Sequence, residues 1–209
     1  MSAPSDPRTA RIDGRRLRSE RTKQLIIEAF LALLRENPST PMPTAARIAE
    51  RAGYSVRSIF ERFPDLKQLR AAATDYQLAQ AAALSPPRHV DGDRATRIRS
   101  QVETRAGTCE RGISLWRVLL YSADQDEELR PRIRLARERT IQRLELMYRP
   151  ELSTLSERER QHLLIALEAI TDMESWARMR ELHGLSVEEA CGVWIRAVDR
   201  ILPPTPGAS

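Results

Sequence analysis

The sequence lacks the segments that would place it in or across a membrane. No stretch approaches about 18 uncharged apolar residues, the length that a membrane-spanning helix needs. The first residues, Met1 to Pro7, contain no apolar segment of the kind found in secretory signals. The two cysteines, Cys109 and Cys191, match neither a zinc spacing nor a disulfide framework. We therefore expect a cytoplasmic protein with free thiols and no membrane partner.

The chain also lacks the motifs of common enzyme classes. It contains no glycine-rich phosphate loop, no nucleophile elbow and no zinc-ligand spacing. Glu159 and His162 have the spacing of a di-iron ligand pair, but a helical di-iron site needs two such pairs, and only one is present. We expect no enzymatic activity, no catalytic residue, no bound metal and no cofactor.

Positive charge is concentrated in the first third of the 209 residues. Residues 1–70 hold 14 Lys+Arg and 8 Asp+Glu, a net charge of +6, whereas residues 71–209 hold 20 and 21, a net of −1. This asymmetry indicates a segment that binds a polyanion, although a solvated basic tail gives the same pattern. Only two of the 34 basic residues, Lys23 and Lys67, are lysine, and the forked donors of arginine suit phosphate and guanine.

Apolar residues recur at helical spacing and no strand-type alternation persists, so we predict an all-α fold of about nine helices. Residues 1–18 mix Pro, Ser, Gly and Arg without an apolar period, and we expect a flexible basic arm there. The first helix is expected to begin near Ser19 and to end before Pro38. Later helices are expected at about 44–52, 55–62, 65–84, 91–106, 110–122, 126–148, 156–183 and 186–202, with Gly107 as one of the breaks. A domain boundary is expected at Ser85-Pro86-Pro87.

The most informative window is Thr44 to Phe63, which reads as two short helices joined by a tight turn. Ala49 provides the small side chain for a close helix crossing, Gly53 supplies a left-handed turn, and Ile59 fills the angle between the helices. This spacing is typical of a helix-turn-helix, although a helical hairpin without a nucleic-acid role has the same pattern. The basic first third favours the DNA-binding interpretation.

The same window resembles the DNA-binding domain of TetR-type transcriptional regulators over about residues 21–70. The resemblance rests on IAERAGYS at residues 48–55, IFERFPD at residues 59–65, and Leu69. It implies a homodimer that binds a palindromic operator, with residues 55–62 as the recognition helix in the major groove. It divides the chain into the arm (1–18), a DNA-binding domain (19–64), a connecting helix (65–84) and a ligand-binding and dimerisation domain (85–209).

Two positions depart from the family pattern. Phe60 replaces a tyrosine whose hydroxyl usually reaches a phosphate, and Leu66 replaces a lysine that usually follows a Phe-Pro-Ser run. Each change removes a polar contact with the DNA backbone. Arg62, Lys67 or the arm are candidates to compensate for it.

We assign candidate DNA contacts by side-chain chemistry. Arg57 is the leading base reader, because arginine reads guanine through O6 and N7, and Val56 suits a thymine methyl group. Glu61 either accepts from a cytosine amino group or pairs with a neighbouring arginine. The full set of candidates is Thr44, Arg47, Tyr54, Ser55, Val56, Arg57, Ser58, Phe60, Arg62 and Lys67. Five basic residues are candidates for a minor-groove arm, with disorder as the alternative: Arg15, Arg16, Arg18, Arg21 and Lys23.

The C-terminal part carries two further sets of candidates. Apolar stripes on the last two helices predict a four-helix dimer interface, with a core within one chain as the alternative. The interface set is Leu163, Leu167, Ile170, Trp176, Val187, Trp194, Val198 and Ile201. A small-molecule pocket is expected from Trp116, Leu119, Leu120, Tyr121, Met147 and Tyr148, which favours an apolar or amphipathic ligand.

The sequence therefore predicts a homodimeric TetR-type repressor that a small ligand releases from a double-stranded DNA operator. The alternatives are a helical interaction scaffold without a DNA role, and a family member that activates transcription or senses no small molecule.

Overall fold

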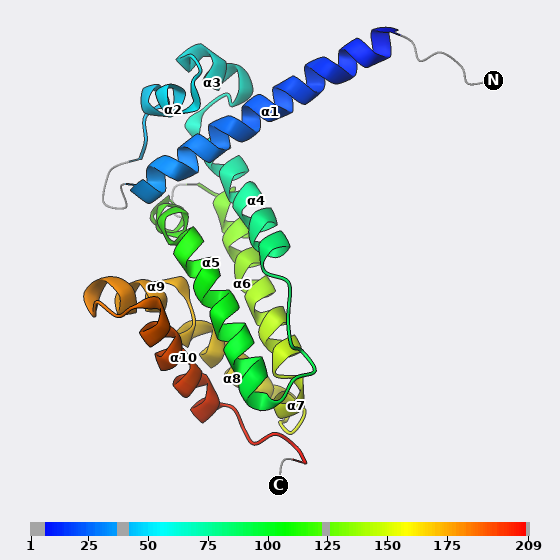
Figure 1. Ribbon diagram of the computed structural model, residues 1–209, viewed down its shortest axis with the longest axis vertical. Coiled ribbons are helices and arrows are strands. Elements are labelled where there is room, and N and C mark those ends of the chain that lie inside the picture. Colours follow the sequence, from blue (N-terminus) through cyan, green and yellow to red (C-terminus); the bar gives the residue numbers. More distant parts are fainter. Residues whose placement is uncertain (1–6, 37–41, 123–125, 208–209) are drawn as a thin grey trace, which may run out of the picture. The chain divides into compact units, whose positions relative to one another are not determined.

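The computed structural model describes residues 7–36, 42–122 and 126–207, with side chains from Arg16 onward, and every regular element within them is helical (Figure 1). The all-α prediction is thus confirmed. The helices are α1 (Pro7–Glu36), α2 (Ala45–Ala52), α3 (Val56–Arg62), α4 (Leu66–Leu84), α5 (Arg94–Ser122), α6 (Leu129–Met147), α7 (Arg149–Leu152), α8 (Glu157–Ile170), α9 (Met173–Ala177), the π-helical η1 (Arg178–Leu182) and α10 (Val187–Ile201). In the described part of the chain no helix is both long and apolar enough to cross a membrane.

The chain divides into two compact units, which we call the head unit (Met1–Tyr76) and the body unit (Gln77–Ser209). The division falls inside α4, so this helix contributes residues to both units.

The head unit is built from α1, α2, α3 and the first part of α4. Its core contains Ile26 and Phe30 of α1, Ile48 of α2 and Ile59 of α3, which are at most 1% exposed. Burying these large apolar side chains is the main stabilising contribution available to so small a unit. A polar contact ties the unit further, because the Tyr76 hydroxyl lies 2.9 Å from Glu28 Oε1 and donates to it.

The first helix is longer than the sequence pattern predicts. It begins at Pro7 rather than near Ser19, so residues 7–18 are helical where a flexible arm was expected. Arginine and alanine are good helix formers, but residues 7–18 lack the apolar stripe by which an amphipathic helix is identified in a sequence. Without that stripe, the periodicity of the sequence does not indicate a helix in residues 7–18.

The body unit is organised around α5, which packs against α6, α9 and α10. Trp176 and Trp194 lie at the centre of its core, with ring centroids 4.8 Å apart and planes tilted by 49°. The indole N–H of Trp176 donates to Glu110 Oε1 over 2.7 Å, so this buried ring keeps its polar atom hydrogen-bonded.

Two helix boundaries in the body unit differ from the predicted ones. Gly107 lies inside α5 and does not break it, because a packed helix absorbs the cost of about 1 kcal/mol that one glycine brings. The predicted helix over 156–183 instead ends at Ile170. Asp172 begins a new helix there, since its carboxylate accepts from the backbone N–H of Ser175 at 2.6 Å.

A buried ion pair connects α5 to α7. The guanidinium of Arg97 donates to both carboxylate oxygens of Glu151, at 2.6 and 2.8 Å, and these residues are 2% and 0% exposed. The Thr205 hydroxyl donates to the same carboxylate at 2.5 Å. Burial acts to raise the pKa of Glu151, but the hydrogen bonds from Arg97 and Thr205 outweigh it and hold this pKa below its ordinary value.

Candidate nucleic-acid interface

The turn between α2 and α3 is set by Gly53. Its φ of +73° lies in the left-handed region, which a residue without Cβ adopts at little cost. Its N–H donates to the carbonyl of Glu50 at 3.2 Å, and the N–H of Tyr54 donates to that of Ala49 at 2.9 Å. Ala49 is 3% exposed at the crossing of the two helices. The local geometry is therefore the tight helix-turn-helix that the sequence window predicts.

Side-chain hydroxyls cap both short helices. Thr44 Oγ1 accepts from the N–H of Arg47 at 3.4 Å, and Ser55 Oγ accepts from the N–H of Ser58 at 3.1 Å. The hydroxyls of Ser55 and Ser58 also lie 3.0 Å apart. Each cap is expected to stabilise its helix by about 1 kcal/mol. Each of these hydroxyls has a further lone pair that could accept another hydrogen bond, but the contact seen in the structure is the cap of its own helix.

The outer face of α3 combines a cation with two apolar side chains. Arg57 has 88% of its side chain exposed, and Val56 and Phe60 are 41% and 45% exposed. Ile59, on the opposite face of the same helix, is completely buried. The burial of Ile59 fixes the rotation of α3 about its own axis, so that Val56, Arg57 and Phe60 are directed to solvent.

Glu61 is paired with both arginines of α3. Its Oε1 accepts from Arg57 Nε at 3.0 Å, and its Oε2 lies 3.9 Å from the guanidinium of Arg62. Of the two roles considered for Glu61, the structure therefore shows pairing with neighbouring arginines. The Arg62 side chain is 30% exposed and its buried Nε has no hydrogen-bond partner, so only its outer nitrogens face solvent.

The other candidate contacts have different surroundings. Arg47 and Lys67 are exposed and have no carboxylate partner among the described residues. Tyr54 is half-buried, and its hydroxyl lies 3.5 Å from the hydroxyl of Thr22 on α1, which favours packing over a phosphate contact. Leu66 is half-buried as well.

The basic residues before Lys23 belong to a helix rather than to an extended arm. Arg16, Arg18 and Arg21 are exposed on α1, and Lys23 lies 3.5 Å from Glu20. A continuous helix of about 10 Å diameter does not enter a minor groove of about 6 Å as an extended arm does. These residues are therefore helical rather than part of an extended arm, and their contact with a minor groove stays a prediction; the side chain of Arg15 lies outside the described part.

The six residues predicted to line a pocket differ in their burial. Leu119, Met147 and Tyr148 are buried, whereas Leu120 and Tyr121 are 37% and 85% exposed. Trp116 is half-buried, with the guanidinium of Arg137 5.9 Å from its ring centre. None of the six lines the two described hollows of about 490 and 580 Å³. Helical periodicity identified apolar positions but not which of them would face each other.

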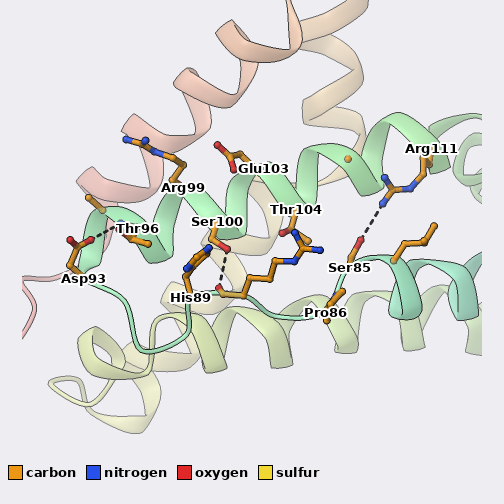
Figure 2. A pocket seen from close by; sticks show the side chains of 14 residues that line it. Ser85, Pro86, His89, Asp93, Thr96, Arg99, Ser100, Glu103, Thr104 and Arg111 are labelled. Atoms are coloured by element: carbon orange, nitrogen blue, oxygen red, sulfur yellow. Dashed lines mark hydrogen bonds between the residues drawn. The ribbon is translucent and has the colours of Figure 1, made fainter.

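The hollow of about 490 Å³ is polar instead. Figure 2 shows it between α5 and the segment that follows α4, with side chains from both. The guanidinium of Arg111 reaches the Ser85 hydroxyl at 3.1 Å, and Ser100 donates to the carbonyl of Arg88 at 2.9 Å. The sequence did not indicate this hollow, because five of its 14 lining residues lie in the loop before α5, where no periodicity marks a shared face.

The predicted interface residues fall into two groups. Four of them are at most 2% exposed inside one chain and belong to its own core: Leu167, Trp176, Trp194 and Val198. The two predicted anchors, Trp176 and Trp194, are thus covered by their own chain, and an apolar stripe looks the same in sequence whether its own chain or a second chain covers it. Val187 and Ile201 remain 42% and 39% exposed, and Leu163 and Ile170 are half-buried.

Both cysteines are buried free thiols, and burial raises the pKa of Cys109 to about 11. A thiol with so high a pKa is scarcely ionised at neutral pH, so Cys109 is poorly suited to a redox sensor.

Comparison with known proteins gives matches at the level of structure alone. No protein-family model matches the chain, and no curated protein sequence matches it. A crystal structure from Rhodococcus sp., described as a TetR-family transcriptional regulator, superposes with a TM-score of 0.67 at 19% identity, covering 87% of this chain and 98% of that one. A transcriptional regulator from Rhodococcus sp. Rha1 gives 0.68 at 14% identity, with coverage of 88% and 99%.

The chain has the TetR fold. Coverage of nearly nine-tenths means that the likeness includes the helices of the body unit as well as the helix-turn-helix. The sequence motifs lie only in the head unit. The likeness of the body unit to these regulators is seen only in the structure.

Proposed function

We propose that this protein is a DNA-binding transcriptional regulator of the TetR type, and that it acts as a homodimeric repressor on a palindromic operator. The observation that carries the proposal is the solvent-exposed face of α3, held in place by Gly53 and by the buried Ile59. A seven-residue helix that exposes an arginine and two apolar side chains matches the donors, acceptors and methyl groups of the major groove.

Within this proposal each exposed residue has a role. Arg57 reads a guanine, and Val56 contacts a thymine methyl group. Arg47 and Lys67 neutralise phosphates and fix the position of the head unit on the duplex. The exposed arginines of α1 add sequence-independent attraction.

A homodimer is supported by apolar side chains that one chain leaves uncovered on α8 and α10. Ile165, Val187, Val193 and Ile201 are between 38% and 53% exposed. In a two-fold dimer the same residues of both chains cover one another. Two recognition helices are then expected about 34–36 Å apart, one turn of DNA.

A small-molecule effector completes the proposal. It is apolar or amphipathic, as the sequence predicted, and it releases DNA only to the extent that it binds the released state more tightly. We do not assign it to the hollow beside α5, because arginine, serine and threonine line that hollow.

The test is selection of bound sequences from a random duplex pool at near-physiological salt. Enrichment of an inverted repeat with half-sites about one helical turn apart supports the proposal. Binding without enrichment that fades as salt rises would favour the interaction scaffold instead. Transcription from a promoter that carries the selected repeat then distinguishes a repressor from an activator.

A further inference from the structure

The leading base reader of the proposed interface is not free in solution. Glu61 follows Arg57 by one helical turn, and its carboxylate holds the guanidinium through Nε at 3.0 Å. The side chain of Arg57 is largely exposed, at 88%, and that of Glu61 is about half exposed, at 48%. A surface pair of this kind adds only about 0.3–0.5 kcal/mol to stability. Because this contribution to stability is so small, we looked for a role of the pair in DNA binding.

The geometry of the pair leaves the recognition edge of Arg57 available. A guanidinium carries five N–H donors, and the contact with Glu61 uses the one on Nε. The two terminal nitrogens keep four donors, which suffice for paired hydrogen bonds to O6 and N7 of guanine. Glu61 thus limits the rotamers of Arg57 without blocking base recognition. Arg57 therefore loses less conformational entropy when it binds a base.

The same carboxylate opposes contacts with phosphate. Glu61 lies between the two arginines of α3, 3.0 Å from Arg57 and 3.9 Å from Arg62. A phosphate that approaches either guanidinium meets a negative charge beside it, whereas a guanine edge presents neutral acceptors. Repulsion of the wrong partner is a general way to gain specificity.

We infer that Glu61 is a specificity-determining residue, which presents Arg57 to a guanine and suppresses the attraction of α3 to the phosphates of random DNA. This inference rests on the proposed function. It predicts that removing the charge of Glu61 tightens binding to random DNA more than binding to the operator. The ratio of the two affinities, rather than either affinity alone, is the quantity that Glu61 controls.

The main variant is Glu61→Gln, which removes the charge but keeps an oxygen that can accept from Arg57. One added phosphate contact is expected to make the salt dependence of random-duplex binding steeper by about one, in log–log terms, and to tighten binding by about threefold at low salt. The matched control is Glu50→Gln on α2, because Glu50 is exposed and has no ion-pair partner among the described residues. Both variants change the net charge of the head unit equally.

The measurement is the equilibrium affinity of the full-length protein for the selected operator and for a scrambled duplex of equal composition, at several salt concentrations. A fall in the operator-to-scrambled ratio for Glu61→Gln, with little change for Glu50→Gln, supports the inference. A double-mutant cycle adds a second criterion: in an Arg57→Ala background, Glu61→Gln should change the ratio much less.

Two results would overturn the inference. One is an unchanged ratio in Glu61→Gln, and the other is an equal fall in Glu50→Gln, which would indicate a general effect of charge. Either result leaves the proposed function intact, provided that the wild-type protein binds its operator selectively. If the selection enriches no operator, the proposed function fails, and the role of Glu61 falls with it.

Discussion

The head and body units use arginine in opposite ways. Arg57 in the head unit is 88% exposed and has one carboxylate neighbour, which contacts a single nitrogen. Arg97 in the body unit is 2% exposed, and its nitrogens donate to Glu151, to Met147 O at 2.7 Å and to Gly92 O at 3.0 Å. A buried guanidinium must have its donors satisfied, whereas an exposed one keeps donors for a ligand. The side chain is the same, and burial decides whether it serves stability or recognition.

The largest effect is expected from Glu151→Gln in the body unit. It leaves the Arg97 charge buried and uncompensated, so the free energy of unfolding should fall by about 3–5 kcal/mol. Urea denaturation measures this loss. Glu103→Gln on α5 is the control, because Glu103 is exposed and has no ion-pair partner among the described residues. Equal and small effects of both variants would contradict the structural role of the buried pair.

The same carboxylate predicts how stability depends on pH. The pKa of Glu151 in the folded protein lies below the ordinary 4.5, so its contribution is complete above about pH 4.5. The contribution disappears as the pH falls through the folded-state pKa, because protonation removes the charge that Arg97 requires. The difference in unfolding free energy between wild type and Glu151→Gln should therefore shrink in acid. If the difference stays constant with pH, the variant does not destabilise the protein through the loss of the Glu151 charge.

An intermediate effect is expected from Arg57→Ala in the head unit. It should weaken operator binding by about 1–3 kcal/mol and relax the preference at one base position, while the free energy of unfolding stays nearly unchanged. Binding to operators substituted at each position measures both. If operator and random duplex lose the same affinity, Arg57 is a phosphate contact rather than a base reader.

The smallest effect is expected from Phe60→Tyr, which restores the hydroxyl usual in TetR-type regulators. Phe60 is 45% exposed, so a tyrosine fits without repacking. One added hydrogen bond to a phosphate should tighten binding by about 0.5–1.5 kcal/mol, on operator and random duplex alike. A gain confined to the operator, or no gain, would show that residue 60 does not face the backbone.

Local signals in the sequence predicted the head unit well. Thr44, Gly53 and Ser55 act within a few residues of their own position, and each occupies the cap or turn that its chemistry favours. The same kind of signal failed where a helix carried no apolar stripe, as in residues 7–18. At Asp172 the opposite occurred. The aspartate could have been identified as a helix N-cap, but the apolar stripe continues past it and led to the prediction of one uninterrupted helix.

By itself the sequence determined what depends on neighbours along the chain: the helices, the turn at Gly53 and the chemistry of α3. The tertiary structure decided what depends on distant partners. It showed that Trp176 and Trp194 face each other inside one chain, and that Arg97 lies beside Glu151. Helical periodicity specifies which face of a helix is apolar, but not what covers that face. Only packing in three dimensions distinguishes a core from an interface, or a stabilising arginine from one that is ready to bind.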